Sequence, residues 1–176
     1  MRRLHELAGL EISLVQPNLF KHDYEFHAGE EIAAVLHFRS AFGSLAIGES
    51  ADGAWTFKRV GFWQTRVTVR PAQSETELAV FKNNTWTQGG TLEFPDGRVF
   101  QANTNFWKTE YEFKNPAGEP LVKFKQIGGF FHLSSQVSIL PAAGELAELP
   151  VLVLLGGYLV VMLQRDSAAA AAATAS

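Results

Sequence analysis

Short apolar runs alternate with polar clusters between about residues 24 and 140 of the chain. The runs are rich in Val, Phe, Thr and Trp, which favour strands, whereas the clusters contain the Gly, Asn, Asp and Pro of tight turns. The pattern therefore predicts antiparallel strands joined by hairpins. Turns are expected at four places: Asp52-Gly53, Pro71 to Thr76, Asp96-Gly97 and Asn115 to Glu119.

The predicted turns lie about 20 to 24 residues apart, a regular step that is typical of a meander of hairpins. Further strands are expected at Ile12–Gln16, Tyr24–Phe26, Ile32–Arg39 and Ile127–Leu140. Together with the hairpins they give a mainly β fold of about ten to twelve strands, enough for a closed barrel or a sandwich.

The stretch "LPVLVLLGGYLVVMLQR" (Leu149–Arg165) follows another pattern, because it is apolar on every face. The 13 residues between Pro150 and Gln164 carry no charge, whereas a membrane-spanning helix needs about 20. A short helix that is apolar all round is typical of one surrounded by protein. We predict a helix at 151–164 inside a shell of strands. A buried strand, suggested by the valines, and a membrane anchor are the alternatives.

Two details of this C-terminal region matter for the fold. Gly156-Gly157 lies in the middle of the predicted helix, where each glycine costs about 1 kcal/mol relative to alanine, so close approach of a neighbouring backbone is expected there. The sequence after Asp166 is low in complexity and rich in alanine. We therefore expect one domain at 1–166 and a frayed or disordered tail at 167–176.

Composition limits the class of protein. The chain has 176 residues, enough for one domain, and 47% of them are hydrophobic. It contains no cysteine, which excludes disulfides, zinc–thiolate sites and cysteine nucleophiles. The N-terminal residues lack the apolar core of a secretory signal, so none is expected. The net charge of −3 argues against a broad nucleic-acid footprint, and no nucleic-acid partner is expected.

Candidate catalytic and metal-binding residues are few. His22 and His27 in "HDYEFH" would lie on opposite faces of a strand, and no H-E-x-x-H pattern occurs. "GESADG" is one residue too long for a G-x-S-x-G nucleophile elbow. We predict no catalytic residue, no metal site and no cofactor. Four tryptophans are interpreted as packing residues rather than as a base-stacking platform: Trp55, Trp63, Trp86 and Trp107.

The order of elements, many hairpins followed by one fully apolar C-terminal helix, resembles the tubby-like C-terminal superfamily. That superfamily includes tubby proteins, phospholipid scramblases and the plant LURP-one-related proteins. The resemblance covers roughly residues 24 to 165 and implies a single closed antiparallel barrel of twelve strands around a central hydrophobic helix. It is carried by "WTFKRVG" (Trp55–Gly61), "LEFPDGRVFQ", "YEFKNPAGEPLVKFK" and "LPVLVLLGGYLVVMLQR" in the place of the central helix.

The resemblance also implies a lipid role, because tubby domains bind phosphoinositides through basic residues on the barrel surface, including a pair one apart on a strand. Lys123 and Lys125 in "KFK" have that spacing and are the candidate lipid-binding residues. Alternation would place both on one face of the strand, whereas Lys58 and Arg59 are adjacent and would face opposite ways. The simpler interpretation of Lys123 and Lys125 is a solvated strand face.

A lumen filled by a helix has no room for a ligand of the kind that lipocalins hold, so binding is expected on the outer surface or the rim. We predict a non-enzymatic binding or scaffold module at the surface of anionic, phosphoinositide-like membranes, or on a protein partner. We expect it to be cytoplasmic and peripheral to the membrane, with no integral span. One alternative is a small-ligand or hydrolytic barrel in which the C-terminal segment is a strand or lid. The other is a tail-anchored membrane protein that uses 151–164.

Overall fold

The computed structural model describes residues 1–61, 65–84, 89–105, 107–127 and 134–175. Twelve strands precede one long helix, with a short 3-10 turn before the first strand and another after the last. The strands are β1 Glu11–Val15, β2 Asp23–Ala28, β3 Glu31–Phe38, β4 Ala46–Ser50, β5 Gly53–Val60, β6 Arg66–Pro71, β7 Ala79–Asn84, β8 Gly89–Glu93, β9 Val99–Thr104, β10 Glu110–Lys114, β11 Pro120–Gln126 and β12 Ser134–Ile139. The helices are η1 Leu4–Leu7, η2 Pro141–Ala143 and α1 Leu149–Thr174.

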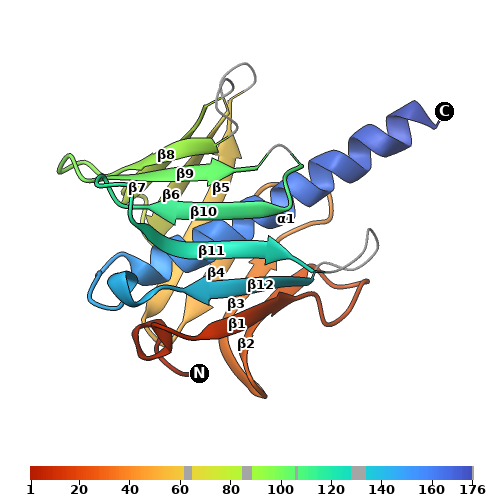
Figure 1. The fold of residues 1–176 in the computed structure, drawn as a ribbon. Coiled ribbons are helices and arrows are strands. Elements are labelled where there is room, and N and C mark those ends of the chain that lie inside the picture. Colours follow the sequence, from red (N-terminus) through yellow and green to blue (C-terminus); the bar gives the residue numbers. More distant parts are fainter. Residues whose placement is uncertain (62–64, 85–88, 106, 128–133, 176) are drawn as a thin grey trace.

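The strands form one closed antiparallel barrel, as the resemblance implies (Figure 1). Each strand pairs with its neighbours in the sequence, and β1 pairs with β12 to close the sheet. Closure leaves no open edge on which another chain could add a strand. Alternate residues point into the lumen, as Ile12 and Leu14 of β1 do.

The predicted turns lie where the sequence places them. The hairpins β4–β5, β6–β7, β8–β9 and β10–β11 turn at residues 51–52, 72–78, 94–98 and 115–119. Gly97 and Gly118 have φ angles of +90° and +84°, which explains glycine at these two turn positions. The first three predicted strands are present within two residues of their expected bounds. Of the strand expected at Ile127–Leu140, β12 covers the second half, and residues 128–133 lie outside the described part.

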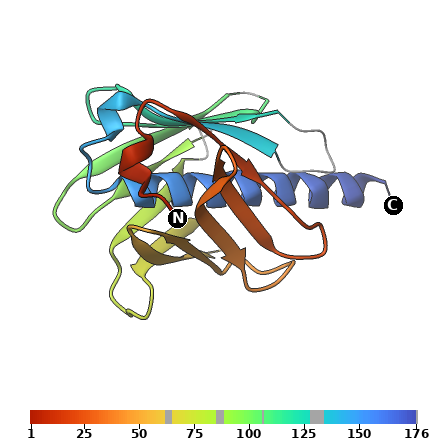
Figure 2. The ribbon, with the colours of Figure 1, turned by 90° about the horizontal axis from the view of Figure 1, so that it is seen from below.

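The apolar stretch forms a helix that runs through the barrel from end to end (Figure 2). Residues 149–159 are all buried, so the expectation of an enclosed helix is confirmed and the buried-strand alternative is wrong. The helix is longer than the expected 151–164, since it begins at Leu149 and continues to Thr174. The alanine-rich segment is therefore helical up to Thr174, because alanine favours the helix without any burial.

The helix α1 is long and apolar enough to cross a membrane, judged by length and composition alone. However, 72% of its most apolar 18-residue window is buried inside the barrel. The core helix of a soluble protein meets the same criterion. The apolar surface of this helix is thus already covered by the inward side chains of the strands.

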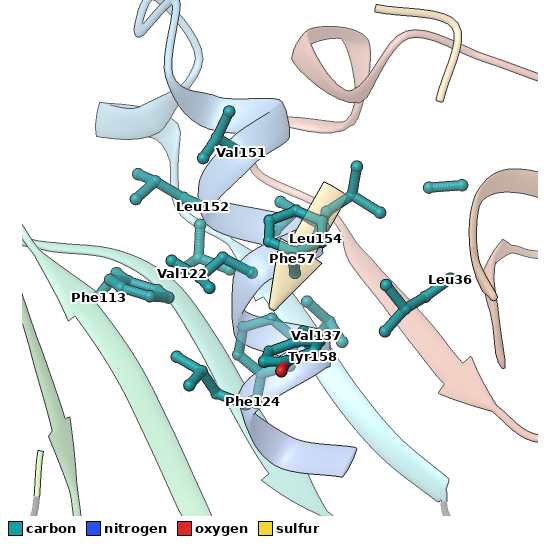
Figure 3. Packing of buried hydrophobic residues seen from close by; sticks show 14 of the residues in the cluster. Leu36, Phe57, Phe113, Val122, Phe124, Val137, Val151, Leu152, Leu154 and Tyr158 are labelled. Carbon is teal, nitrogen blue, oxygen red and sulfur yellow. The ribbon is translucent and has the colours of Figure 1, made fainter. Parts of the chain in front are cut away.

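Two aromatic rings explain why the helix has glycine at positions 156 and 157. A Cβ atom at Gly156 would lie 2.2 Å from Cε2 of Phe124, and one at Gly157 would lie 2.4 Å from Cζ of Phe26. The close approach is therefore by two rings, not by a neighbouring backbone as the sequence had suggested. Tyr158 stacks on Phe38 with ring centroids 5.4 Å apart. Figure 3 shows how side chains from several strands surround the helix.

Candidate functional site

Polar contacts hold the helix where it leaves the barrel, at what we call the exit end. The Arg59 guanidinium donates to both carboxylate oxygens of Asp166 at 2.6 and 3.2 Å, and this bond raises the pKa of Arg59. The guanidinium of Arg165 lies 4.0 Å from the ring centroid of Phe38 and donates to the carbonyl oxygen of Gly43 at 3.2 Å. These contacts attach the helix to β5 and to the connection between β3 and β4.

The hydroxyl of Tyr158 adds two partly buried hydrogen bonds to this attachment. It donates to the carbonyl oxygen of Ser44 at 2.7 Å and accepts from the backbone N–H of Arg59 at 3.1 Å. Burial raises the pKa of Tyr158 to about 12 from its ordinary 10.0. The folded protein therefore holds the phenol proton more tightly than the unfolded chain does.

This proton linkage predicts an alkaline loss of stability. The contribution of Tyr158 is complete below about pH 10 and should be lost as the pH rises to about 12, which removes about 2 to 3 kcal/mol from the free energy of unfolding. Urea unfolding at stepped pH measures it. Tyr158→Phe should lower stability at neutral pH by about 1 to 3 kcal/mol and flatten the alkaline limb. An unchanged pH profile in Tyr158→Phe would contradict this assignment.

Exposed apolar side chains gather on the strand connections at the exit end. Phe20 is 94% exposed, Trp107 is 78% exposed and Phe42 is fully exposed. Three exposed cations lie in the same connections, and none of them forms an ion pair with any described residue. We call this set the exit rim: Leu19, Phe20, Phe42, Trp107 and Ile127 with Lys21, Arg39 and Lys108.

The charge of the connections differs sharply between the two ends of the barrel. The connections that follow the odd-numbered strands contain no Asp or Glu in their sequence. These connections are 16–22, 39–45, 61–65, 85–88, 105–109 and 127–133. Acidic residues are found in every turn at the opposite end: Glu30, Asp52, Glu75, Glu77, Asp96 and Glu119. Near the rim, the Asp23 carboxylate is bonded to His37 and that of Asp166 to Arg59. The protein thus has a basic end and an acidic end.

A groove of about 410 Å³ lies between the exit end of the helix and strands β10 to β12. Its apolar lining includes Tyr111, Phe124, Val160 and Leu163. A second hollow of about 300 Å³ shares Lys108, Tyr111 and Leu163 with it. We call the first hollow the exit groove. It lies beyond the tightly packed middle of the lumen.

The lysines predicted from the sequence lie on the outside of the barrel, and acidic side chains lie next to them. Lys123 and Lys125 are both exposed on the same face of β11, as their spacing predicts. Glu112 lies opposite Lys123 and Glu110 opposite Lys125, and the Lys123 Nζ is 3.9 Å from a Glu112 oxygen. Their lipid role stays a prediction, and the facing glutamates lower the positive potential there.

Lys58 is exposed, whereas Arg59 reaches the helix, so their expected opposite orientation is confirmed. The His27 Nε2 lies 2.8 Å from a Glu25 oxygen. Within the described ranges, no group of three His, Cys, Asp or Glu side chains could hold a metal ion. Trp55 packs against the core, whereas Trp63 and Trp86 lie outside the described residues.

Sequence reasoning missed the exit rim. The sequence did contain a signal for the exit rim. Alternate connections of an antiparallel meander lie at the same end of the sheet, and in this chain one such set contains aromatic residues and no acidic ones. The resemblance instead directed attention to the strand faces. Comparison with known proteins adds nothing further: no family model, no curated protein and no solved structure matches the chain.

Proposed function

We propose that the protein is a non-enzymatic, peripheral membrane-binding module that docks its exit end on an anionic lipid surface. The observation that carries this proposal is the exit rim, in which exposed aromatic side chains and cations without an ion-pair partner among the described residues share connections that lack acidic residues. Aromatic residues favour the boundary between water and hydrocarbon, and basic residues are attracted to anionic headgroups.

The rim supplies two kinds of binding energy. Full burial of a Phe side chain contributes about 1.5 to 3 kcal/mol, and Phe20 and Phe42 have almost all of their surface to bury. Each Lys or Arg near an anionic surface adds about 1 kcal/mol. Lys21, Arg39 and Lys108 would therefore contribute about 3 kcal/mol together.

The two ends of the barrel also favour one orientation. The acidic turns at the far end would be repelled from an anionic surface while the rim is attracted to it. The net charge of −3 hides this asymmetry because it averages over both ends. The helix leaves the barrel at the rim, as Figures 1 and 2 show, and its residues beyond Asp166 are uncharged. That extension would meet the interfacial layer without a charge to desolvate.

Co-sedimentation with lipid vesicles tests the proposal. The wild type should bind vesicles of phosphatidylcholine with phosphatidylserine at low salt and bind pure phosphatidylcholine more weakly. The variant K21E/R39E/K108E should lose about 3 kcal/mol or more of binding, roughly a hundredfold. The matched control K58E/K123E/K125E changes the net charge equally but on the outer strand faces, and it should retain most of the binding.

Two results would refute the proposal. One is a wild type that does not bind the anionic vesicles at low salt. The other is an equal loss in both triple variants, since that would make net charge or the strand faces responsible. A greater loss in K58E/K123E/K125E would instead support the lysine site expected from the resemblance. F20S/F42S should weaken vesicle binding by a factor that does not depend on salt concentration, because the lost contacts are apolar.

A further inference from the structure

Two hydroxyl groups on the exit groove form no hydrogen bond with any described residue. Ser135 lies on the lumen side of β12, and its fully buried Oγ forms no hydrogen bond. Tyr111 points into the lumen from β10 and is 6% exposed, and its hydroxyl takes part in no hydrogen bond of the described residues. Burial alone raises the pKa of Tyr111, which agrees with the lack of a bonding partner. Both residues line the exit groove.

A buried hydroxyl without a partner, like that of Ser135, is unusual in a folded protein. Most buried polar side-chain atoms have a hydrogen-bond partner, because a hydroxyl that leaves water without one loses its solvation. Such an atom beside a cavity indicates that its partner comes from outside the chain, and the Tyr111 hydroxyl on the same cavity offers a second hydrogen-bonding group. The volume of about 410 Å³ is within the range of small-molecule sites.

The lining also selects the chemistry of the occupant. Phe124, Val160 and Leu163 offer apolar walls for a hydrocarbon or aromatic body. Among the described lining residues, the charged ones are Lys108 and Glu110, which are both exposed and opposite in sign. A carboxylate or ammonium group beside Ser135 would therefore be desolvated without a counter-charge. A neutral oxygen, by contrast, could accept a hydrogen bond from each hydroxyl.

We infer that the exit groove binds a neutral amphiphile, an apolar body bearing one hydroxyl or carbonyl oxygen that hydrogen-bonds with Ser135 and Tyr111. The ligand is either an uncharged lipid drawn from a membrane or a soluble compound of the same chemistry. The groove shares Trp107 and Lys108 with the exit rim, but this inference does not depend on membrane docking, because Ser135 and Tyr111 lie on strands inside the barrel.

Equilibrium dialysis of the full chain in vesicle-free buffer tests the inference with three probes of one shape. Naphthalene has no oxygen, 2-naphthol has a hydroxyl and 2-naphthoate has a carboxylate. We expect 2-naphthol to bind at least about fivefold more tightly than either of the others, the effect of one hydrogen bond. Displacement of 2-naphthol by 1-decanoylglycerol in phosphatidylcholine vesicles would identify the ligand as an uncharged membrane lipid. Displacement only by soluble alcohols would identify it as a soluble compound.

Matched variants locate the binding site. Ser135→Ala and Tyr111→Phe should each weaken 2-naphthol binding about fivefold and leave naphthalene binding unchanged. Ser135→Ala should melt at or above the wild-type temperature, because it removes a buried unsatisfied hydroxyl, and Tyr111→Phe should melt close to the wild-type temperature, because it breaks no hydrogen bond of the described residues. Ser134→Ala, on the outward face of the same strand, is the control and should bind like the wild type.

Leu163→Trp provides an independent check, because it fills the groove and should block all three probes. The inference is overturned if 2-naphthol binds no better than naphthalene. It is also overturned if binding is unaffected by both Ser135→Ala and Tyr111→Phe. Neither result depends on vesicle sedimentation, so failure here and failure of the proposed membrane role are distinguishable.

Discussion

Truncating the chain after Pro150 should abolish the folded barrel. The removed residues supply the packed centre of the lumen, including Leu152, Leu155 and Tyr158, which are all fully buried. Each such side chain contributes about 1.5 to 3 kcal/mol, so the summed loss exceeds the whole stability of a typical domain, about 5 to 15 kcal/mol. The truncated chain should show no cooperative thermal transition by circular dichroism and no dispersed amide resonances.

The control is truncation after Asp166, which removes residues 167–176 and keeps the Arg59–Asp166 ion pair. Those described beyond Asp166 are exposed, so the melting temperature should change by only a few degrees. If the helix were instead a membrane tail anchor, the truncation after Pro150 should leave the barrel folded. A soluble, cooperatively folded product ending at Pro150 would therefore show that the helix is an anchor and not the core.

Strands and turns were predictable because their signals are local. Asp96-Gly97 and Asn115 to Glu119 identify their turns through residue types that few other conformations favour, and alternation in the flanking runs assigns the inward faces. The glycine pair of the helix was a correct sign of crowding. The sequence could not reveal that the crowding atoms are the rings of Phe124 and Phe26, because those contacts depend on how the helix is rotated in the barrel.

The functional surface was harder to predict, because it depends on contacts between distant segments. Aromatic residues such as Phe42 and Trp107 resemble core residues in composition, and only the topology shows that their connections meet at one end. Lys123 and Lys125 were correctly placed on one face, but their spacing carries no information about what lies opposite. The register of β10 and β11 supplies that information by bringing glutamates next to both.

Replacing Gly156 by valine should be among the most damaging single changes in the core. The Cβ atom alone would lie 2.2 Å from the ring of Phe124, and the two methyl groups would add further overlap. We expect a loss of about 4 kcal/mol or more in the free energy of unfolding, more than the usual 1 to 3 kcal/mol of overpacking, because the helix is enclosed on all sides. Urea unfolding measures the loss.

A double-mutant cycle with Phe124→Ala identifies the cause. Phe124→Ala alone should cost about 3 to 5 kcal/mol, because it leaves a cavity beside the helix. In the double variant the valine methyl groups would occupy part of that cavity, so its loss should fall short of the sum by about 2 kcal/mol or more. Ala170→Val puts the same valine on the exposed part of the helix and should cost less than about 1 kcal/mol. Additive losses in the cycle would mean that the ring of Phe124 does not lie against Gly156, and the helix would then have to be seated in the barrel with a different rotation.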